Sequence, residues 1–150
     1  MGFGQGALLM TPLQMALLGA TIANGGNEPR PYLVREVVSG GISASSSERA
    51  TLASPVSLDT ATKVANMMVA VVRRGTGTPA QLPHVTVAGK TGTATNPLGR
   101  SHAWFVAFAP AQKPRVAVSI VVENVGYGAT YAAPIARDVI RTALESGVNL

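Results

Sequence analysis

The chain of 150 residues contains no cysteine, a single tryptophan and few charged side chains. The absence of cysteine excludes disulfide bonds and thiolate-ligated metals. Aromatic residues make up 5% and charged residues 13% of the chain, and its 12 Lys and Arg are scattered. Nucleic-acid binding requires basic residues gathered on one surface, so we expect no nucleic-acid partner. A hydrophobic content of 47% is typical of a folded domain.

Long hydrophobic runs are also missing. The apolar stretch 7–23 is interrupted by Thr11, Pro12 and Gln14, and it is too short to span a bilayer. The first residues lack the positive charge of a signal peptide, so we expect no membrane anchor in the chain. The His, Asp and Glu residues have no metal-site spacing, and we predict no metal and no cofactor.

Capping residues mark two helix starts. Thr11 precedes a proline and lies three residues before Gln14, which is the pattern of a capping box. We therefore predict a helix over 12–23, and its apolar residues on nearly all sides predict deep burial. Ser57 caps a second predicted helix that ends at about residue 74, and apolar residues at helical spacing over 132–144 predict a third.

Between and after these helices the apolar residues follow the pattern of strands. The polar segment 39–54 is predicted to be a loop, and the predicted strands cover 32–38, 85–93, 103–109 and 116–123. The last two strands are apolar on both faces, which favours central strands. Their short connection favours an antiparallel hairpin. We predict an α+β fold, an antiparallel sheet packed with helices.

The segment Val-Ala-Gly-Lys-Thr-Gly-Thr-Ala, 87–94, carries the strongest functional signal. A phosphate-binding P-loop would need glycine at position 84, where the chain has His84, and a helix directly after the motif. Neither condition is met. A strand edge that carries Lys90 and the hydroxyls of Thr91 and Thr93 instead suits recognition of a carboxylate and stabilisation of an oxyanion.

Lys90-Thr91-Gly92 resembles the K-T-G motif of penicillin-binding proteins and serine β-lactamases. The likeness extends over nearly the whole chain and points to class B transpeptidases, in particular the penicillin-binding protein A type of actinobacteria. The segments that carry it, besides 87–94, are Gly4-Gln5-Gly6, 9–16, Ala23-Asn24-Gly25-Gly26, Pro31 and His102-Ala103-Trp104-Phe105 with Ala109-Pro110.

The resemblance implies a role for each residue of the motif. Lys90 would supply positive charge, Thr91 and Thr93 would bind a terminal carboxylate with Gly92 admitting the ligand, and the Thr93 N–H would be an oxyanion donor. The implied partners are the D-alanyl-D-alanine stem peptide of peptidoglycan and β-lactams. The implied function is cross-linking of peptidoglycan by an acyl-serine D,D-transpeptidase at the extracytoplasmic face of the cell membrane.

The family's nucleophile motif, S-x-x-K, does not occur in the chain, because the residues three before its lysines are Thr60, Val87 and Pro110. No asparagine completes S-x-N either. We therefore expect residues 1–150 to be the C-terminal portion of a penicillin-binding/serine β-lactamase-like transpeptidase domain. The missing N-terminal part, or self-association, would cover its exposed faces. The alternatives are a non-catalytic binding or structural module and kinship with β-lactamases.

Residues around the motif receive plainer interpretations. The loop 75–79 is a helix exit, and the family resemblance also makes it a candidate border of the site. His102 is interpreted as structural or as a residue bordering the cleft, and Trp104 as a core residue.

Incubation of the 150-residue chain with a fluorescent penicillin should leave no covalent label, because the chain lacks the family's acylated serine motif. Gel fluorescence and intact mass would measure the label. A labelled residue anywhere in the chain would contradict this expectation.

Overall fold

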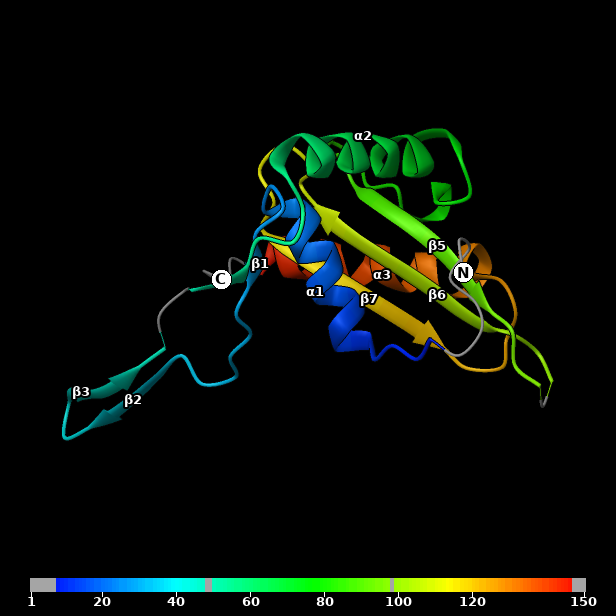
Figure 1. Ribbon diagram of the computed structural model, residues 1–150. Helices are drawn as coiled ribbons and strands as arrows, with labels where there is room; N and C mark the ends of the chain where they lie inside the picture. Colours follow the sequence, from blue (N-terminus) through cyan, green and yellow to red (C-terminus); the bar gives the residue numbers. More distant parts are fainter. Residues whose placement is uncertain (1–7, 48–49, 98, 147–150) are drawn as a thin grey trace.

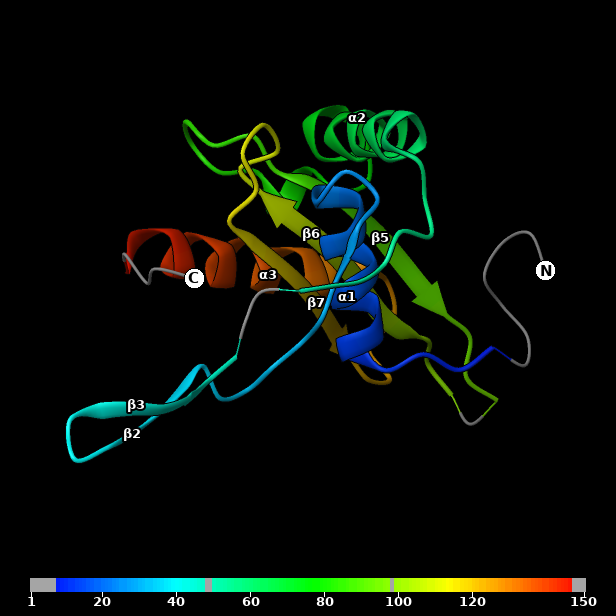
Figure 2. The same cartoon turned by 60° about the vertical axis from the view of Figure 1, so that its left-hand side comes forward.

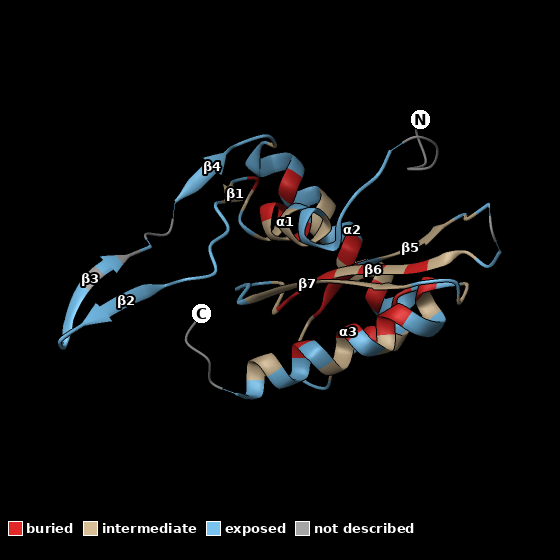
Figure 3. Cartoon of the chain, turned by 90° about the horizontal axis from the view of Figure 1, so that it is seen from below, coloured by how far each residue is buried: buried red, intermediate tan, exposed pale blue. Residues whose placement is uncertain are grey.

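The computed structural model describes residues 8–47, 50–97 and 99–146. In the part described, a three-stranded sheet lies between helix α3 on one face and helices α1 and α2 on the other (Figures 1 and 3). The elements are α1 Pro12–Ala23, β1 Glu28–Pro29, β2 Glu36–Ser39, β3 Ile42–Ser46, β4 Thr51–Ala53, α2 Leu58–Arg74, the 3-10 helix η1 Thr78–Ala80, β5 Ala88–Ala94, β6 His102–Ala109, β7 Val116–Val122 and α3 Gly128–Glu145.

The main sheet has the order β5-β6-β7 with both pairs antiparallel, which confirms the predicted α+β class and the hairpin between the last two strands. The prediction that β7 is central is wrong for the described strands, because only β6 has a neighbour on each side. Helices α1 and α3 contact β7 on its two faces. The apolar residues on both faces of β7 therefore correctly indicate that helices cover both faces. The same pattern does not indicate whether a strand lies at the edge or in the middle of the sheet.

Helix α1 begins as its sequence predicts. The Thr11 hydroxyl accepts a hydrogen bond from the Gln14 N–H, and the Gln14 side chain accepts one from the Thr11 N–H. The predicted deep burial is wrong, since only Gly19, Thr21 and Ile22 of the helix are buried. One side of α1 rests on the sheet, and nothing in the described structure covers the other side, where Leu13 is 60% exposed.

Two apolar clusters hold the helices to the sheet. Phe105 lies in the cluster between the sheet and α3, and it is 1% exposed. Phe108 lies in the cluster between the sheet and the other two helices, where it meets Met68 of α2. Because successive side chains of a strand point to opposite faces, odd-numbered residues of β6 face α3 and even-numbered residues face α1 and α2.

The predicted loop over 39–54 contains β3, the second strand of a hairpin, and β4, which pairs with β1, and the strand predicted over 32–38 forms only at its end, as β2. β2 pairs with β3 through a turn at Gly40 and Gly41, whose φ angles are 60° and 81°. Two glycines with positive φ suit the two-residue turn that joins twisted antiparallel strands. The hairpin projects away from the body of the molecule (Figure 2), and the described residues of β2 are all exposed.

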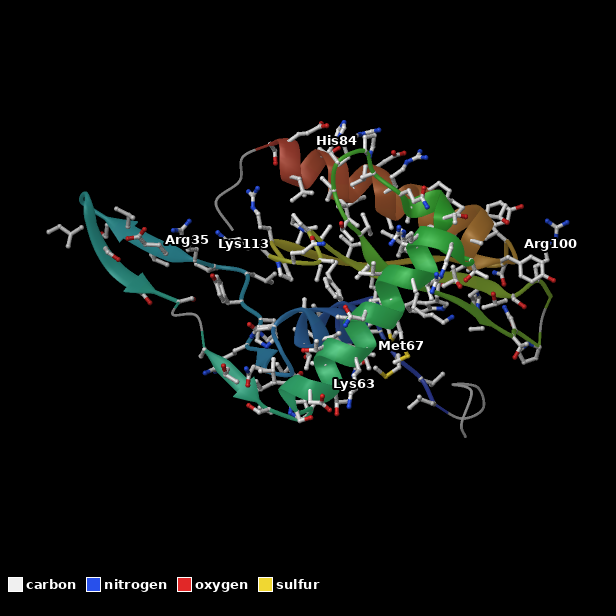
Figure 4. All side chains as sticks on the ribbon, turned by 90° about the horizontal axis from the view of Figure 1, so that it is seen from above. Arg35, Lys63, Met67, His84, Arg100 and Lys113 are labelled. Atoms are coloured by element: carbon white, nitrogen blue, oxygen red, sulfur yellow. The ribbon has the colours of Figure 1, made fainter. Side chains whose placement is uncertain are left out.

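Charged side chains are dispersed over the surface. Figure 4 shows Arg35, Lys63, Arg100 and Lys113 on separate elements or turns, and Arg100 extends from the turn between β5 and β6. In the described segments, no helix has the length and apolar character that would let it cross a membrane.

Replacing exposed apolar residues of α1 should reduce self-association of the isolated chain without unfolding it. Leu13 and Leu18 are 60% and 48% exposed, so Leu13→Gln and Leu18→Gln remove exposed apolar surface and disturb few contacts within the folded chain. Light scattering would measure the change in mass. Ile22→Ala is the matched control, because it truncates a buried residue of the same helix and should cost about 2–5 kcal/mol of stability. A parent chain that is already a monodisperse monomer would contradict the prediction.

Candidate functional site

The K-T-G segment lies on β5, an edge strand of the described sheet. Ala88 joins the cluster beneath α1 and α2, so Lys90 and Gly92, at steps of two residues, lie on that face. Thr91 and Thr93 lie on the α3 face. The strand therefore brings the four candidate residues to one edge, with the Cα–Cβ bonds of Lys90 and of the two threonines directed to opposite faces.

The glycines of β5 are required by the close approach of β6. A Cβ at position 89 would lie 2.5 Å from Cζ of Phe105, which is buried. A Cβ at position 92 would lie 3.0 Å from Cβ of Trp104. A side chain at either position would displace Phe105 or Trp104, so these glycines allow the two aromatic side chains to lie against β5 while Gly89 pairs with Ala107 and Gly92 with Trp104.

The ammonium group of Lys90 lies at the edge of β5, next to the backbone of Thr91. The side chain of Lys90 is exposed, and its Nζ donates a hydrogen bond of 2.7 Å to the carbonyl oxygen of Thr91. The ammonium group therefore lies beside the backbone of the K-T-G segment rather than extending into solvent. A ligand along this edge would meet a full positive charge at that point.

The loop after α2 contributes a second hydroxyl group to the site. The Oγ1 atoms of Thr76 and Thr91 are 2.7 Å apart, which is a hydrogen bond between two hydroxyls. Helix α2 packs against β5, and its capping residue Gly75 ends it just before Thr76. The structure thus places the loop 75–79 beside the motif. The sequence made this loop a candidate border of the site without singling out one residue, and the contact of Thr76 within it depends on the packing of α2.

The first residue of α3 supports β5 from the α3 face. A Cβ on Gly128 would lie 2.2 Å from the Trp104 carbonyl oxygen and 2.6 Å from the Gly92 carbonyl oxygen. Gly128 is buried, and the helix backbone therefore rests directly on the backbones of both strands behind the motif. Since backbone atoms cannot rotate away as side chains can, this contact fixes the position of β5 at Gly92.

His102 and Trp104 lie one strand away from the motif. His102 pairs with Ala94 in the register, and its Nδ1 accepts a hydrogen bond of 3.1 Å from the backbone N–H of Asn124. Trp104 is half-buried instead of part of the core as predicted, because it lies on the Lys90 face opposite Gly92, which has no side chain to cover it.

This arrangement suits an extended ligand better than a compact one. In an antiparallel pair, alternate backbone groups of an edge strand point away from the partner strand. A peptide lying along the edge of β5 can therefore pair with backbone groups beside the Lys90 ammonium group and the threonine hydroxyls. Among the described residues, no group of three His, Asp or Glu could hold a metal ion.

Comparison with known proteins identifies one family. The sequence model described as "Penicillin binding protein transpeptidase domain" matches residues 1–141. The peptidoglycan D,D-transpeptidase PbpA of Mycolicibacterium smegmatis is 41% identical over 96% of this chain, which spans 31% of that protein. The stage V sporulation protein D of Bacillus subtilis is 32% identical over 98% of the chain, which spans 25% of that protein.

Solved structures agree with the sequence comparison. Penicillin-binding protein A from M. tuberculosis, in its penicillin G acyl-enzyme complex, matches with a TM-score of 0.85 and 41% identity over 94% of this chain. The D,D-transpeptidase domain of a peptidoglycan glycosyltransferase from Eggerthella lenta matches with a TM-score of 0.85 and 42% identity over 93% of it. The chain spans 33% of each of those two structures.

The variant Gly128→Ala should lower the stability of the chain by roughly 1–3 kcal/mol, because its Cβ would overlap two backbone carbonyl oxygens. Chemical denaturation would measure the midpoint. Thr130→Ala is the control, since Thr130 is exposed in the same turn of α3 and its loss should cost less than about 0.5 kcal/mol. Equal midpoints for the two variants would refute the support assigned to Gly128.

Proposed function

The chain belongs to the penicillin-binding protein transpeptidase domain family, and from that membership we propose that it is the C-terminal part of a serine D,D-transpeptidase that cross-links peptidoglycan. The observation that carries the proposal is the edge strand β5, which holds Lys90-Thr91-Gly92-Thr93 in a regular antiparallel register beside Thr76. Its substrate is the D-alanyl-D-alanine end of a stem peptide, and β-lactams bind at the same edge.

Each residue of the motif has a role in this proposal. The terminal carboxylate of the ligand accepts hydrogen bonds from the hydroxyls of Thr91 and Thr93, while the Lys90 ammonium group supplies positive charge. The N–H of Thr93 donates to the carbonyl oxygen that becomes an oxyanion when the serine attacks. Gly92 presents only backbone to the ligand, so the substrate can lie close to the strand.

The nucleophilic serine belongs to another stretch of the protein. Its Oγ forms an ester with the penultimate residue of the stem peptide while the terminal D-alanine leaves, and an amine of a second stem peptide then takes over the acyl group. No lysine of this chain has serine three positions before it, whereas the chain spans 31% and 25% of the two curated relatives. We place the S-x-x-K segment in that additional length.

The uncovered side of α1 indicates where the additional segment docks. Leu13 and Leu18 are exposed on a helix that packs on the same face of the sheet as Lys90. Helix α1 lies over β6 and β7, so a segment that covers these leucines would lie on the Lys90 face of the same sheet. In the complete protein we place this domain at the extracytoplasmic face of the membrane, where peptidoglycan is assembled.

Thr91→Val should weaken recognition of the ligand carboxylate in the complete transpeptidase. A hydrogen bond to a charged group is worth about 1.5–3 kcal/mol, so the acylation rate constant for a penicillin should fall by tenfold or more. The methyl ester of the same penicillin lacks the carboxylate charge, and its slower acylation should change little. Stopped-flow measurement with both compounds isolates the carboxylate contribution from general damage to the site.

Thr76 gives a second arm of the same experiment. When Thr91 donates its proton to the ligand, its oxygen can accept one from Thr76, which strengthens the outgoing bond. Thr76→Val should therefore slow acylation by about threefold for the acid and leave the ester unaffected, whereas Thr76→Ser keeps the hydroxyl and the rate. The double variant should be no slower than Thr91→Val. Equal losses for acid and ester would contradict the carboxylate clamp.

A further inference from the structure

The end of β5 that carries Thr93 depends on contacts made outside the motif. Thr93 pairs with Ala103 and Ala94 pairs with His102, after which the chain enters the turn between β5 and β6. A strand end at a sheet edge opens easily when nothing holds the following turn. The accuracy of an oxyanion donor depends on a displacement of a fraction of an ångström. The support of this turn therefore bears on the chemistry.

Three contacts tie this turn to the turn between β7 and α3. The Nδ1 of His102 accepts the N–H of Asn124 at 3.1 Å, and the Nδ2 of Asn96 donates to the Oδ1 of Asn124 at 2.6 Å. The N–H of Gly126 donates to the carbonyl oxygen of Ser101 at 2.8 Å. Figure 1 shows the two turns side by side at the same end of the sheet.

Asn124 adopts a conformation that needs such an anchor. Its φ is 59°, in the left-handed region that asparagine tolerates better than most residues and that still costs free energy. The imidazole of His102 satisfies its N–H directly and the Asn96 amide satisfies its side chain. The turn then leads through Gly126 to Gly128, whose backbone rests on that of Gly92. A continuous path of contacts therefore runs from the His102 ring to the K-T-G strand.

We propose that His102 is a positioning residue of the transpeptidase site: its Nδ1 holds the β7–α3 turn so that this turn and α3 keep the Thr93 end of β5 in place. The expected effect of His102 on acylation rests on the proposed function. The expected effect of His102 on the position of β5 rests only on the hydrogen bonds and backbone contacts described above. His102 acts through Asn124 and does not itself contact the ligand.

The test compares two variants of equal size in the complete transpeptidase. In His102→Asn, the side-chain oxygen occupies the place of Nδ1 and can accept the Asn124 N–H, whereas His102→Leu has no acceptor there. The acylation rate constant for a penicillin is measured on the fraction of molecules that penicillin can acylate. It should fall about fivefold in His102→Leu and stay within about twofold of the parent in His102→Asn. A purely structural role would lower the melting temperature and the titratable fraction while leaving this rate constant unchanged.

Amide hydrogen exchange of the same proteins separates the two proposals. Exchange at Ala94, whose N–H points to β6 when that of Thr93 points to the ligand, should accelerate in His102→Leu and remain slow in His102→Asn, whether or not the protein reacts with penicillin. Equal exchange in both variants, or equal acylation rate constants, overturns the role of His102. A parent protein that penicillin does not acylate would refute the proposed function, and the exchange result would still decide whether His102 positions the strand.

Discussion

The pairing of β5 with β6 on one side only is the constraint on which the candidate site depends. It fixes the register of Lys90, Thr91 and Thr93 against β6, and in the described sheet it leaves the opposite edge of the strand without a neighbouring strand. A central strand would direct its backbone groups to two partners, whereas an edge strand can add an extended ligand. The same arrangement directs the side chain of Lys90 to one face and those of Thr91 and Thr93 to the other, while the Lys90 ammonium group bends back to the Thr91 carbonyl oxygen at the edge.

The rigidity of this edge comes from both faces of the sheet. Helix α3 presses its first residue, Gly128, onto the backbone behind Gly92, and Phe105 fills the space beneath Gly89. On the opposite face α2 packs against β5 and ends in the loop that carries Thr76. The motif is therefore a short segment whose geometry is set by elements distant in the sequence, so distant substitutions can change how it meets a ligand.

Local sequence signals predicted the elements well, because their causes are local. The capping box of Thr11 and Gln14 and the cap at Ser57 both form as expected. Signals that depend on tertiary neighbours were harder to interpret. The apolar residues of α1 could not reveal that one side lacks cover in the part of the chain that the structure describes. The glycine pair at 40–41 predicts a loop as readily as the β2–β3 turn that it forms. The hydrogen bond between Thr76 and Thr91 joins residues that are 15 positions apart, and no periodic pattern in the sequence predicts such a contact.

The two faces of β5 differ in what this chain supplies to them. The hydroxyls of Thr91 and Thr76 form a pair held within the chain, and in the proposed function this pair recognises the carboxylate end of the ligand. Lys90 projects on the face where α1 leaves Leu13 and Leu18 exposed. Helix α1 lies over β6 and β7, at the opposite edge of the sheet from β5. In the proposed transpeptidase, burial of these leucines by the additional segment would contribute free energy to holding the two parts of the domain together.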